Sequence, residues 1–178
     1  MSSNRVPLSD PIFRRISRLA DAQGVRAFVV GGYVRDYYLR RPSTDIDVVV
    51  VGSGIALAEA LGRELKARVS VFKTFGTAMV RAGRVEVEFV GARKESYTHD
   101  SRKPHVEAGT LEDDQRRRDF TINAMAWSLN GDTYGELVDP FDGMSDLEEC
   151  TIRTPCDPDI TFSDDPLRMM RAVRFASQ

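Results

Sequence analysis

The spacing of hydrophobic and polar positions changes several times along the first half of the chain, and each spacing predicts a different element. Apolar residues recur at helical intervals after Asp10, a residue suited to begin a helix, and Gly24 is suited to end it. Shorter apolar runs bounded by polar residues are typical of strands. In chain order we then expect a strand at Arg26–Val30, a helix at Gly32–Arg40, a strand at Asp45–Val51, a helix capped by Ser53 that continues to Leu65, and strands at Arg68–Lys73, Thr77–Arg81 and Arg84–Val90.

The last three of these strands follow one another closely, which suggests a meander added to the first two strands. We therefore expect an α/β (α+β) architecture, in which helices flank a small mixed or antiparallel sheet of about five strands.

The second half of the chain is less regular. Gly91–Asp114 is polar, so we expect a long loop there. Gln115–Leu129 contains apolar residues at spacings that favour a helix, and Cys150–Arg153 predicts a last short strand. A final helix is expected to begin near Ser163 and is still running at Gln178. We thus expect the chain to stop inside an element, as a truncated protein does.

Composition places the chain among ordinary globular proteins, with 29% charged and 42% apolar residues. No apolar run approaches the roughly 20 residues that span a bilayer, so we expect no membrane segment and a cytoplasmic location. Neither the cysteines nor the histidines form a zinc pattern. The net charge of −2 favours a nucleotide site over a long RNA-binding surface.

Two features near the start of the chain predict a nucleotide site. Gly31 and Gly32 join a buried strand to a helix, whose first N–H groups and dipole can bind phosphate. Asp45 and Asp47 are two apart in a strand, so both carboxylates point to one face, where they can hold Mg²⁺. Each feature alone has a simpler interpretation: a tight connection without a ligand, and a solvated turn.

A third carboxylate is available in the strand that contains Glu86 and Glu88. These two acids share one face, opposite Val85, Val87 and Phe89. A solvated face of an edge strand explains either glutamate equally well. The strand pattern alone leaves the choice between Glu86 and Glu88 open.

Arginines gather in two later segments. Arg116, Arg117 and Arg118 stand together before Asp119, and Arg168, Arg171 and Arg174 recur every third residue of the last helix. A solvated basic edge is the ordinary interpretation of such rows. Guanidinium groups also bind phosphate oxygens in two places and stay charged, which suits a nucleotide site.

Taken together, these motifs resemble one known family. Gly31–Asp36 followed by Asp45-Ile46-Asp47, then Arg117–Ala124 and Asp164–Phe175, are similar to the head domain of the class II tRNA nucleotidyltransferases and bacterial poly(A) polymerases. These belong to the DNA polymerase beta-like nucleotidyltransferase superfamily. One departure is Asp164, where the family usually has glutamate.

The resemblance implies a role for each candidate residue. Asp45 and Asp47 would be metal ligands for Mg²⁺. Glu88 would complete the catalytic set, because the family has a strand acid before an apolar run and an arginine, as in Glu88–Arg93. Glu86 is the alternative. Asp165 and Arg168 would hydrogen-bond the base edge of the incoming nucleotide. Further nucleotide contacts are implied for Gly31, Gly32, Arg35, Arg117, Arg118, Asp119, Asn123, Arg171 and Arg174.

The resemblance also implies an organisation and an activity. Residues 1–150 would form the nucleotidyltransferase head, and residues 151–178 would begin a helical neck. The partners would be CTP, ATP and the 3′ end of tRNA, to which CMP and AMP are added without a nucleic-acid template. Alternatives are a poly(A) polymerase, a CC-adding or A-adding specialist and, in a different class, a non-catalytic nucleotide- or RNA-binding module.

Overall fold

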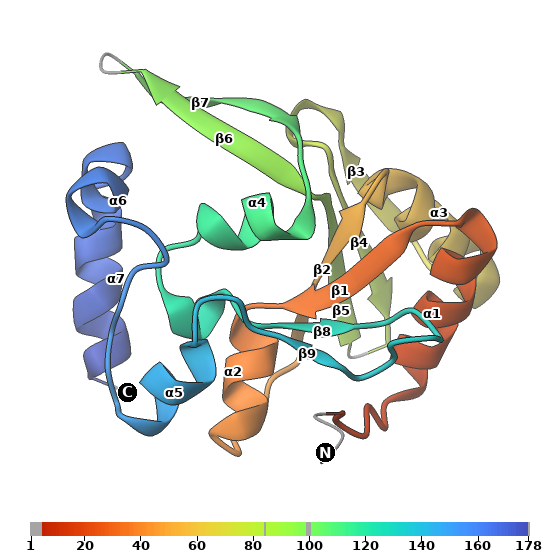
Figure 1. Ribbon diagram of the computed structural model, residues 1–178. Coiled ribbons are helices and arrows are strands. Elements are labelled where there is room, and N and C mark those ends of the chain that lie inside the picture. Colours follow the sequence, from red (N-terminus) through yellow and green to blue (C-terminus); the bar gives the residue numbers. More distant parts are fainter. Residues whose placement is uncertain (1–4, 84, 99–100, 178) are drawn as a thin grey trace.

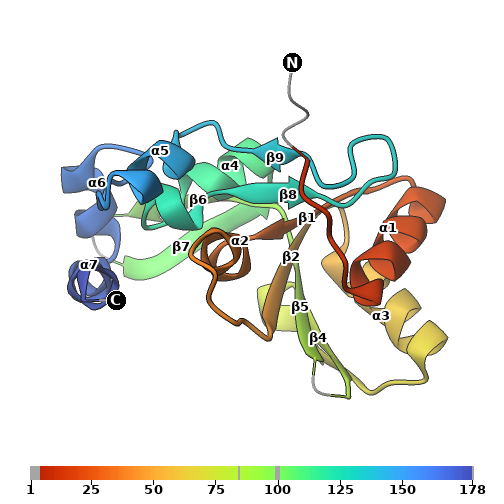
Figure 2. The ribbon, with the colours of Figure 1, turned by 90° about the horizontal axis from the view of Figure 1, so that it is seen from below.

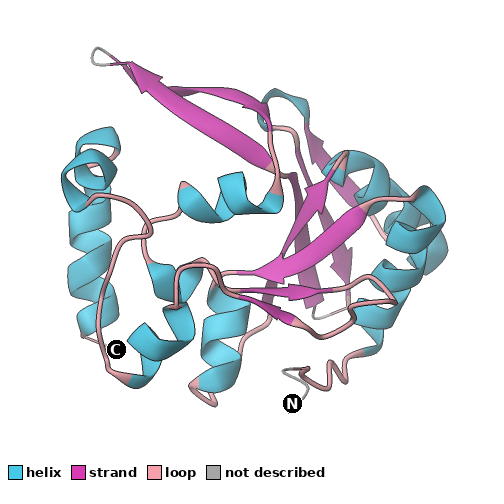
Figure 3. Cartoon of the chain, viewed as in Figure 1, coloured by secondary structure: helices cyan, strands magenta, loops and turns pink. Residues whose placement is uncertain are grey.

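The structure is a computed structural model that describes residues 5–83, 85–98 and 101–177. Its centre is a seven-stranded sheet in the order β3-β4-β5-β2-β1-β8-β9 (Figures 1 and 3). All neighbours in this sheet are antiparallel except β2 and β5, which run parallel. The strands are β1 (Arg26–Val30), β2 (Asp45–Val51), β3 (Val69–Phe72), β4 (Thr77–Ala82), β5 (Val85–Gly91), β8 (Ala126–Ser128) and β9 (Leu137–Val138).

The α/β class and the β3-β4-β5 meander are therefore confirmed, whereas the expected number of about five strands was too low. The two extra strands, β8 and β9, are short and continue the sheet beyond β1. Residue 84, the first of the third predicted meander strand, lies outside the described residues.

Two helices cover one face of the sheet, and their ends follow the expected signals. In α1 (Pro11–Gln23) the Asp10 carboxylate accepts a hydrogen bond from Ile12 N at 2.9 Å, and Gly24 ends the helix in the left-handed conformation. Ser53 caps α3 (Gly54–Leu65) through Ala56 N at 3.1 Å. α1 and α3 lie side by side in Figures 1 and 2, and the main hydrophobic core lies between them and the sheet.

Alternation along β2 decides which face carries the acids. Ile46, Val48 and Val50 enter the main core, while Val49 belongs to a smaller cluster on the opposite face with Phe28. Since successive side chains of a strand point to opposite faces, Asp45 and Asp47 share the face of Val49. The acids therefore lie on the side of the sheet away from α1 and α3.

The expected long loop at Gly91–Asp114 is wrong. This segment forms β6 (Arg93–Thr98) and β7 (Ser101–Ala108), an antiparallel pair, and then enters α4 (Leu111–Arg116). The two strands extend away from the main sheet in Figure 1. The pair is a separate two-stranded sheet. Its sequence is polar and lacks the alternation of apolar and polar residues by which half-buried strands are recognised, so the sequence did not predict it.

The expected helix at Gln115–Leu129 is also wrong. After α4 the chain is extended at Phe120, forms the short 3-10 helix η2 (Thr121–Asn123) and then becomes strand β8. Trp127 pairs with Val29 of β1, so sheet pairing replaces the helix. Residues 119–130 are all buried. A segment buried on every side lacks the polar face that separates a helical from an extended pattern.

The C-terminal part also differs in detail. The strand expected at Cys150–Arg153 is wrong, because these residues form an irregular segment after α5 (Gly143–Glu148). The helix expected from Ser163 is divided into α6 (Pro158–Asp164) and α7 (Leu167–Ala176), with Asp165 extended between them. Pro166 explains the break, because proline disfavours a helical residue before it and cannot donate a backbone hydrogen bond.

α2 (Gly32–Tyr38) follows β1 directly, and α6 and α7 lie at the end of the molecule far from α1 and α3 in both views (Figures 1 and 2). In the described part of the chain, no helix is both long and apolar enough to cross a membrane.

Candidate active site

The parallel pairing of β2 with β5 places two pairs of acids side by side. Asp45 is level with Glu86, and Asp47 is level with Glu88. Glu86 is also held by Arg81 of β4, whose Nε lies 3.0 Å from Glu86 Oε2. Glu88, the acid beside Asp47, has no such ion pair with any residue that the structure describes. The register thus favours Glu88 over Glu86 as the third acid, although its role stays a prediction.

Burial, and to a lesser extent the closeness of the carboxylates, raises the pKa of two of them. The pKa of Glu88 is raised, first by burial and then by the charge of Asp47, and Arg93 opposes the shift. The pKa of Asp47 is also raised, mainly because the surrounding protein removes water from it, while Arg118 opposes the shift. Both residues keep a solvent-exposed side, from which a ligand can approach.

A divalent cation would relieve this crowding, and carboxylate oxygens are the ligands that Mg²⁺ prefers. The donor set of Asp45, Asp47 and Glu88 therefore fits the metal in its chemistry. Among the described residues, no group of three or more His, Cys, Asp or Glu side chains is arranged closely enough to hold a metal ion.

The glycine turn lies directly beside these acids. Gly31 has φ 73° and ψ −132°, a conformation that side chains disfavour, and its N–H donates to Met125 O at 3.2 Å. A Cβ atom at Gly31 would lie 3.1 Å from Arg118 Nη1 and 3.9 Å from Asp47 Oδ2. The structure therefore brings together Gly31, Asp47 and Arg118, three residues from separate motifs.

Arg117 and Arg118 share one carboxylate that the sequence analysis did not select. Asp114 in α4 is fully buried, and its two oxygens bind one arginine each. Arg118 also donates from Nη1 to Asn123 O at 3.3 Å. The sequence could have indicated this contact, because Asp114 stands three residues before Arg117 and four before Arg118, the spacings at which side chains of one helix meet.

A chain of hydrogen bonds joins α2 to α7 through the other predicted residues. Arg35 Nη1 donates to Asn123 Oδ1 at 2.6 Å, and Asn123 Nδ2 donates to Asp119 Oδ1 at 3.1 Å. Asp119 Oδ2 in turn accepts from Arg171 Nε at 2.6 Å. Arg35 also binds Asp36 through Nε and Nη2. Together with Asp36, these residues form one connected network of five side chains, whose contacts to a nucleotide stay a prediction.

The two residues expected to recognise the base lie further along α7. Arg168 donates to two backbone carbonyls, Arg117 O at 2.9 Å and Thr161 O at 3.4 Å, and lines a cavity of about 170 Å³ with Asp164. Asp165 accepts a hydrogen bond from Leu167 N at 3.2 Å at the start of α7. In this structure both side chains hold α7 in place.

Phe175 is a second residue that the sequence analysis did not select. Three guanidinium groups lie around its ring: those of Arg35 and Arg174 at 4.8 Å from the centroid and that of Arg171 at 5.2 Å. The ring also meets Phe120 edge to face. Arg174 is thereby placed near Arg35, on α2, by an aromatic contact.

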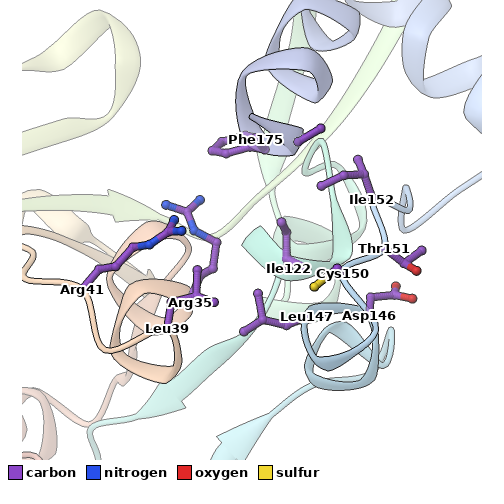
Figure 4. Close-up of a pocket in the computed structure, with 11 residues that line it drawn as sticks. Arg35, Leu39, Arg41, Ile122, Asp146, Leu147, Cys150, Thr151, Ile152 and Phe175 are labelled. Carbon is purple, nitrogen blue, oxygen red and sulfur yellow. The ribbon is translucent and has the colours of Figure 1, made fainter. Parts of the chain in front are cut away.

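A cavity of about 270 Å³ lies next to this group (Figure 4). Arg35 and Arg41 line it from the α2 side, Phe175 lies above them, and Leu147 and Ile152 lie across from them. The lining is largely apolar, so we assign it no part in phosphate binding.

Comparison with known proteins identifies the family. Residues 27–153 match the poly A polymerase head domain. An A-adding tRNA nucleotidyltransferase of Aquifex aeolicus is 45% identical over 154 residues, which are 86% of this chain and 18% of that protein. A CCA-adding enzyme of Enterococcus faecalis is 40% identical over 170 residues, which are 94% of this chain and 39% of that protein.

Solved structures agree with these relatives. A CCA-adding enzyme in an apo form superposes with a TM-score of 0.88 at 37% identity, covering 97% of this chain and 41% of the other. A tRNA nucleotidyltransferase complexed with a primer tRNA and an incoming ATP analog gives a TM-score of 0.79 at 41% identity, covering 90% of this chain and 44% of the other. The chain thus spans less than half the length of these proteins, and over that span it belongs to the poly A polymerase head domain family of nucleotidyltransferases.

Proposed function

We propose that the complete gene product adds nucleotides to the 3′ end of tRNA without a nucleic-acid template, taking CMP from CTP and AMP from ATP. The observation that carries this proposal is the juxtaposition of the Asp47–Glu88 pair with the Gly31 turn and Arg118. It combines hard oxygen ligands, a helix start and a guanidinium group within one site, as transfer from a nucleoside triphosphate needs. The tRNA-processing names of the relatives support the choice of substrate.

In this proposal Asp45, Asp47 and Glu88 would hold two Mg²⁺ ions. When bound, such a pair lowers the pKa of the attacking 3′-hydroxyl and stabilises the pyrophosphate that leaves. The 3′-hydroxyl gives up its proton to solvent, and its oxygen forms a bond to the α-phosphorus while the bond from that phosphorus to the pyrophosphate oxygen breaks, so that pyrophosphate leaves. The backbone at Gly31 and Gly32 leaves room for the triphosphate, and Arg118 adds a positive charge beside it.

Base selection is assigned to Asp165 and Arg168. A carboxylate can accept from the exocyclic amine of cytosine or adenine, and a guanidinium can donate to a ring acceptor. Arg168 now binds the carbonyls of Arg117 and Thr161, so recognition requires some of these hydrogen bonds to be exchanged for the base. We infer that α7 shifts slightly when the nucleotide enters.

The product is the open part of the proposal. The two relatives reported above differ in the nucleotides that their names state, one adding A alone and the other CCA. A CC-adding enzyme or a poly(A) polymerase would use the same carboxylates. A non-catalytic module is disfavoured because Asp45, Asp47 and Glu88 are all present and in register.

The test incubates the complete gene product with Mg²⁺ and each nucleoside triphosphate, alone or paired, on tRNA ending before CCA and on tRNA ending in CC. Addition of C, C and A followed by a stop supports the full reaction. Addition of A only to the CC-ending tRNA indicates an A-adding enzyme, and a long A tail indicates a poly(A) polymerase. No addition to either tRNA contradicts the proposal, and so does addition that a folded Asp47→Ala variant still carries out at the unchanged rate.

A further inference from the structure

A buried carboxylate stands behind the arginines of the candidate site. Asp114 is 0% exposed, near the end of α4, and it faces the guanidinium groups of Arg117 and Arg118. Asp114 Oδ1 accepts from Nε of Arg117 at 3.0 Å and also from its Nη2. Asp114 Oδ2 accepts from Nε of Arg118 at 3.2 Å and from its Nη2 at 3.0 Å. One carboxylate therefore holds two arginines, each by two N–H groups.

This arrangement fixes which edge of Arg118 faces the site. Asp114 occupies the Nε–Nη2 edge, so Nη1 is the nitrogen outside this contact, and it donates to a backbone carbonyl instead. That nitrogen lies 3.3 Å from Asn123 O and beside the Gly31 turn. A guanidinium is planar and rigid, so holding one edge sets the direction of the other.

The charges lead to the same conclusion. Two guanidinium groups against one buried carboxylate leave a net positive charge, and the Asp114 side is closed to solvent. The charge of Arg118 is close enough to Asp47 to oppose the rise in the pKa of that carboxyl, and Arg118 Nη1 lies beside Gly31. The backbone carbonyl of Arg117 also accepts a hydrogen bond from Arg168 Nη2 at 2.9 Å. The residue that Asp114 holds therefore also contacts α7.

We propose that Asp114 is a positioning residue for nucleotidyl transfer: it holds Arg118 so that Nη1 faces the triphosphate position beside Gly31 and Asp47. The inference rests on the proposed function, because it assigns to Arg118 a phosphate contact. Asp114 itself touches neither nucleotide nor metal and acts only through the arginines.

The test compares Asp114→Asn with Asp113→Asn in the complete gene product. The asparagine amide has the shape of the carboxylate, but its NH₂ group is a hydrogen-bond donor and cannot accept from a guanidinium. One of the two arginines therefore loses its hydrogen bonds to residue 114. Asp113 is the adjacent residue and closes the capping box of α4 with Thr110 instead of binding Arg117 or Arg118. Replacing Asp113 weakens α4 but leaves the contact between Asp114 and Arg118 in place. Asp113→Asn is therefore the matched control.

We expect Asp114→Asn to raise the KM for ATP and the Kd for ATP with Mg²⁺ by about tenfold to a hundredfold, the effect of losing one hydrogen bond between charged groups. Preference among the four bases should stay unchanged, because Asp165 and Arg168 are intact. Asp113→Asn should lower the Tm but leave KM and Kd within about twofold.

Three outcomes separate the hypotheses. If the unchanged protein transfers no nucleotide, the proposed function fails. If it is active and folded Asp114→Asn keeps its KM and Kd, or Asp113→Asn raises them equally, the positioning role is overturned. If Asp114→Asn does not fold, Asp114→Glu replaces it, since a charge displaced by one methylene should still raise KM and Kd, and unchanged values would again overturn the role.

Discussion

Arg171 Nε lies 2.6 Å from Asp119 Oδ2, and this ion pair joins α7 to the loop that follows α4. Asp119 is buried and also accepts hydrogen bonds from Phe120 N and Asn123 Nδ2. Asn123 binds Arg35 in turn. The contact between Arg171 and Asp119 therefore connects α7 with α2 as well.

Removing this ion pair should loosen α7. We expect a double-mutant cycle of Arg171→Met and Asp119→Asn to give a coupling of about 1 kcal/mol in the free energy of unfolding, because one partner is buried and the other half-exposed. Urea unfolding measures it. Arg174→Met is the matched control, since Arg174 contacts the ring of Phe175. Coupling of Arg174→Met to Asp119→Asn as strong as that of Arg171→Met would contradict the assignment.

The two glutamates of β5 should differ in their effect on metal-dependent transfer. Glu88 is level with Asp47, whereas Glu86 is level with Asp45 and pairs with Arg81. We expect Glu88→Gln to reduce kcat at saturating Mg²⁺ by at least about a hundredfold, as expected when a group that stabilises the transition state is lost. Glu86→Gln should stay within about threefold. Transfer rates across a Mg²⁺ titration measure both, and equal losses would sink the choice of Glu88.

The two glycines of the turn make a second matched pair. Alanine at Gly31 is strained at φ 73° and places Cβ 3.1 Å from Arg118 Nη1, whereas a Cβ atom at Gly32 meets nothing nearer than Arg35 Nη2 at 3.8 Å. We expect Gly31→Ala to destabilise the protein by about 1–3 kcal/mol and to weaken ATP binding. Gly32→Ala, in the first turn of α2, should change stability by less than about 1 kcal/mol. Thermal unfolding and ATP titration distinguish the two variants, and equal effects would argue against the crowding at Gly31.

The sequence predicted some parts of this fold well because their signals are local. The bounds of β1 and β2 agree with the prediction, since each is a short apolar run between turn residues. In β2 the alternation of Asp45, Ile46 and Asp47 also predicted a common face for the acids. Strand β8 could not be predicted in the same way, because only its pairing with β1 separates it from a buried helix.

The site shows the same limit. The motifs selected Asp47, Gly31 and Arg118 separately, and the fold brings them within contact distance. Asp114 was missed because its burial arises from the return of the chain after α4, although its spacing to Arg117 and Arg118 was visible. Phe175 was missed because its partners come from two helices far apart in the sequence.

Base preference gives the sharpest test of the remaining assignment. If Asp165 accepts from the amine of cytosine or adenine, Asp165→Ala should reduce the preference for CTP over UTP and for ATP over GTP by about tenfold or more, the discrimination of one good hydrogen-bonding pair. The KM for ATP should change less, because the triphosphate contacts remain. Single-nucleotide addition to tRNA lacking CCA measures these ratios in the complete gene product.

Asp164→Ala is the control for this prediction. Asp164 is adjacent but ends α6, whereas Asp165 is the extended residue before Pro166 and α7. Its replacement should disturb the same junction and leave the nucleotide ratios unchanged. A ratio that shifts equally in both variants indicates a general displacement of α7. A ratio that stays unchanged in Asp165→Ala would show that the base is selected elsewhere, and the exchange of hydrogen bonds proposed for Arg168 would then lose its support.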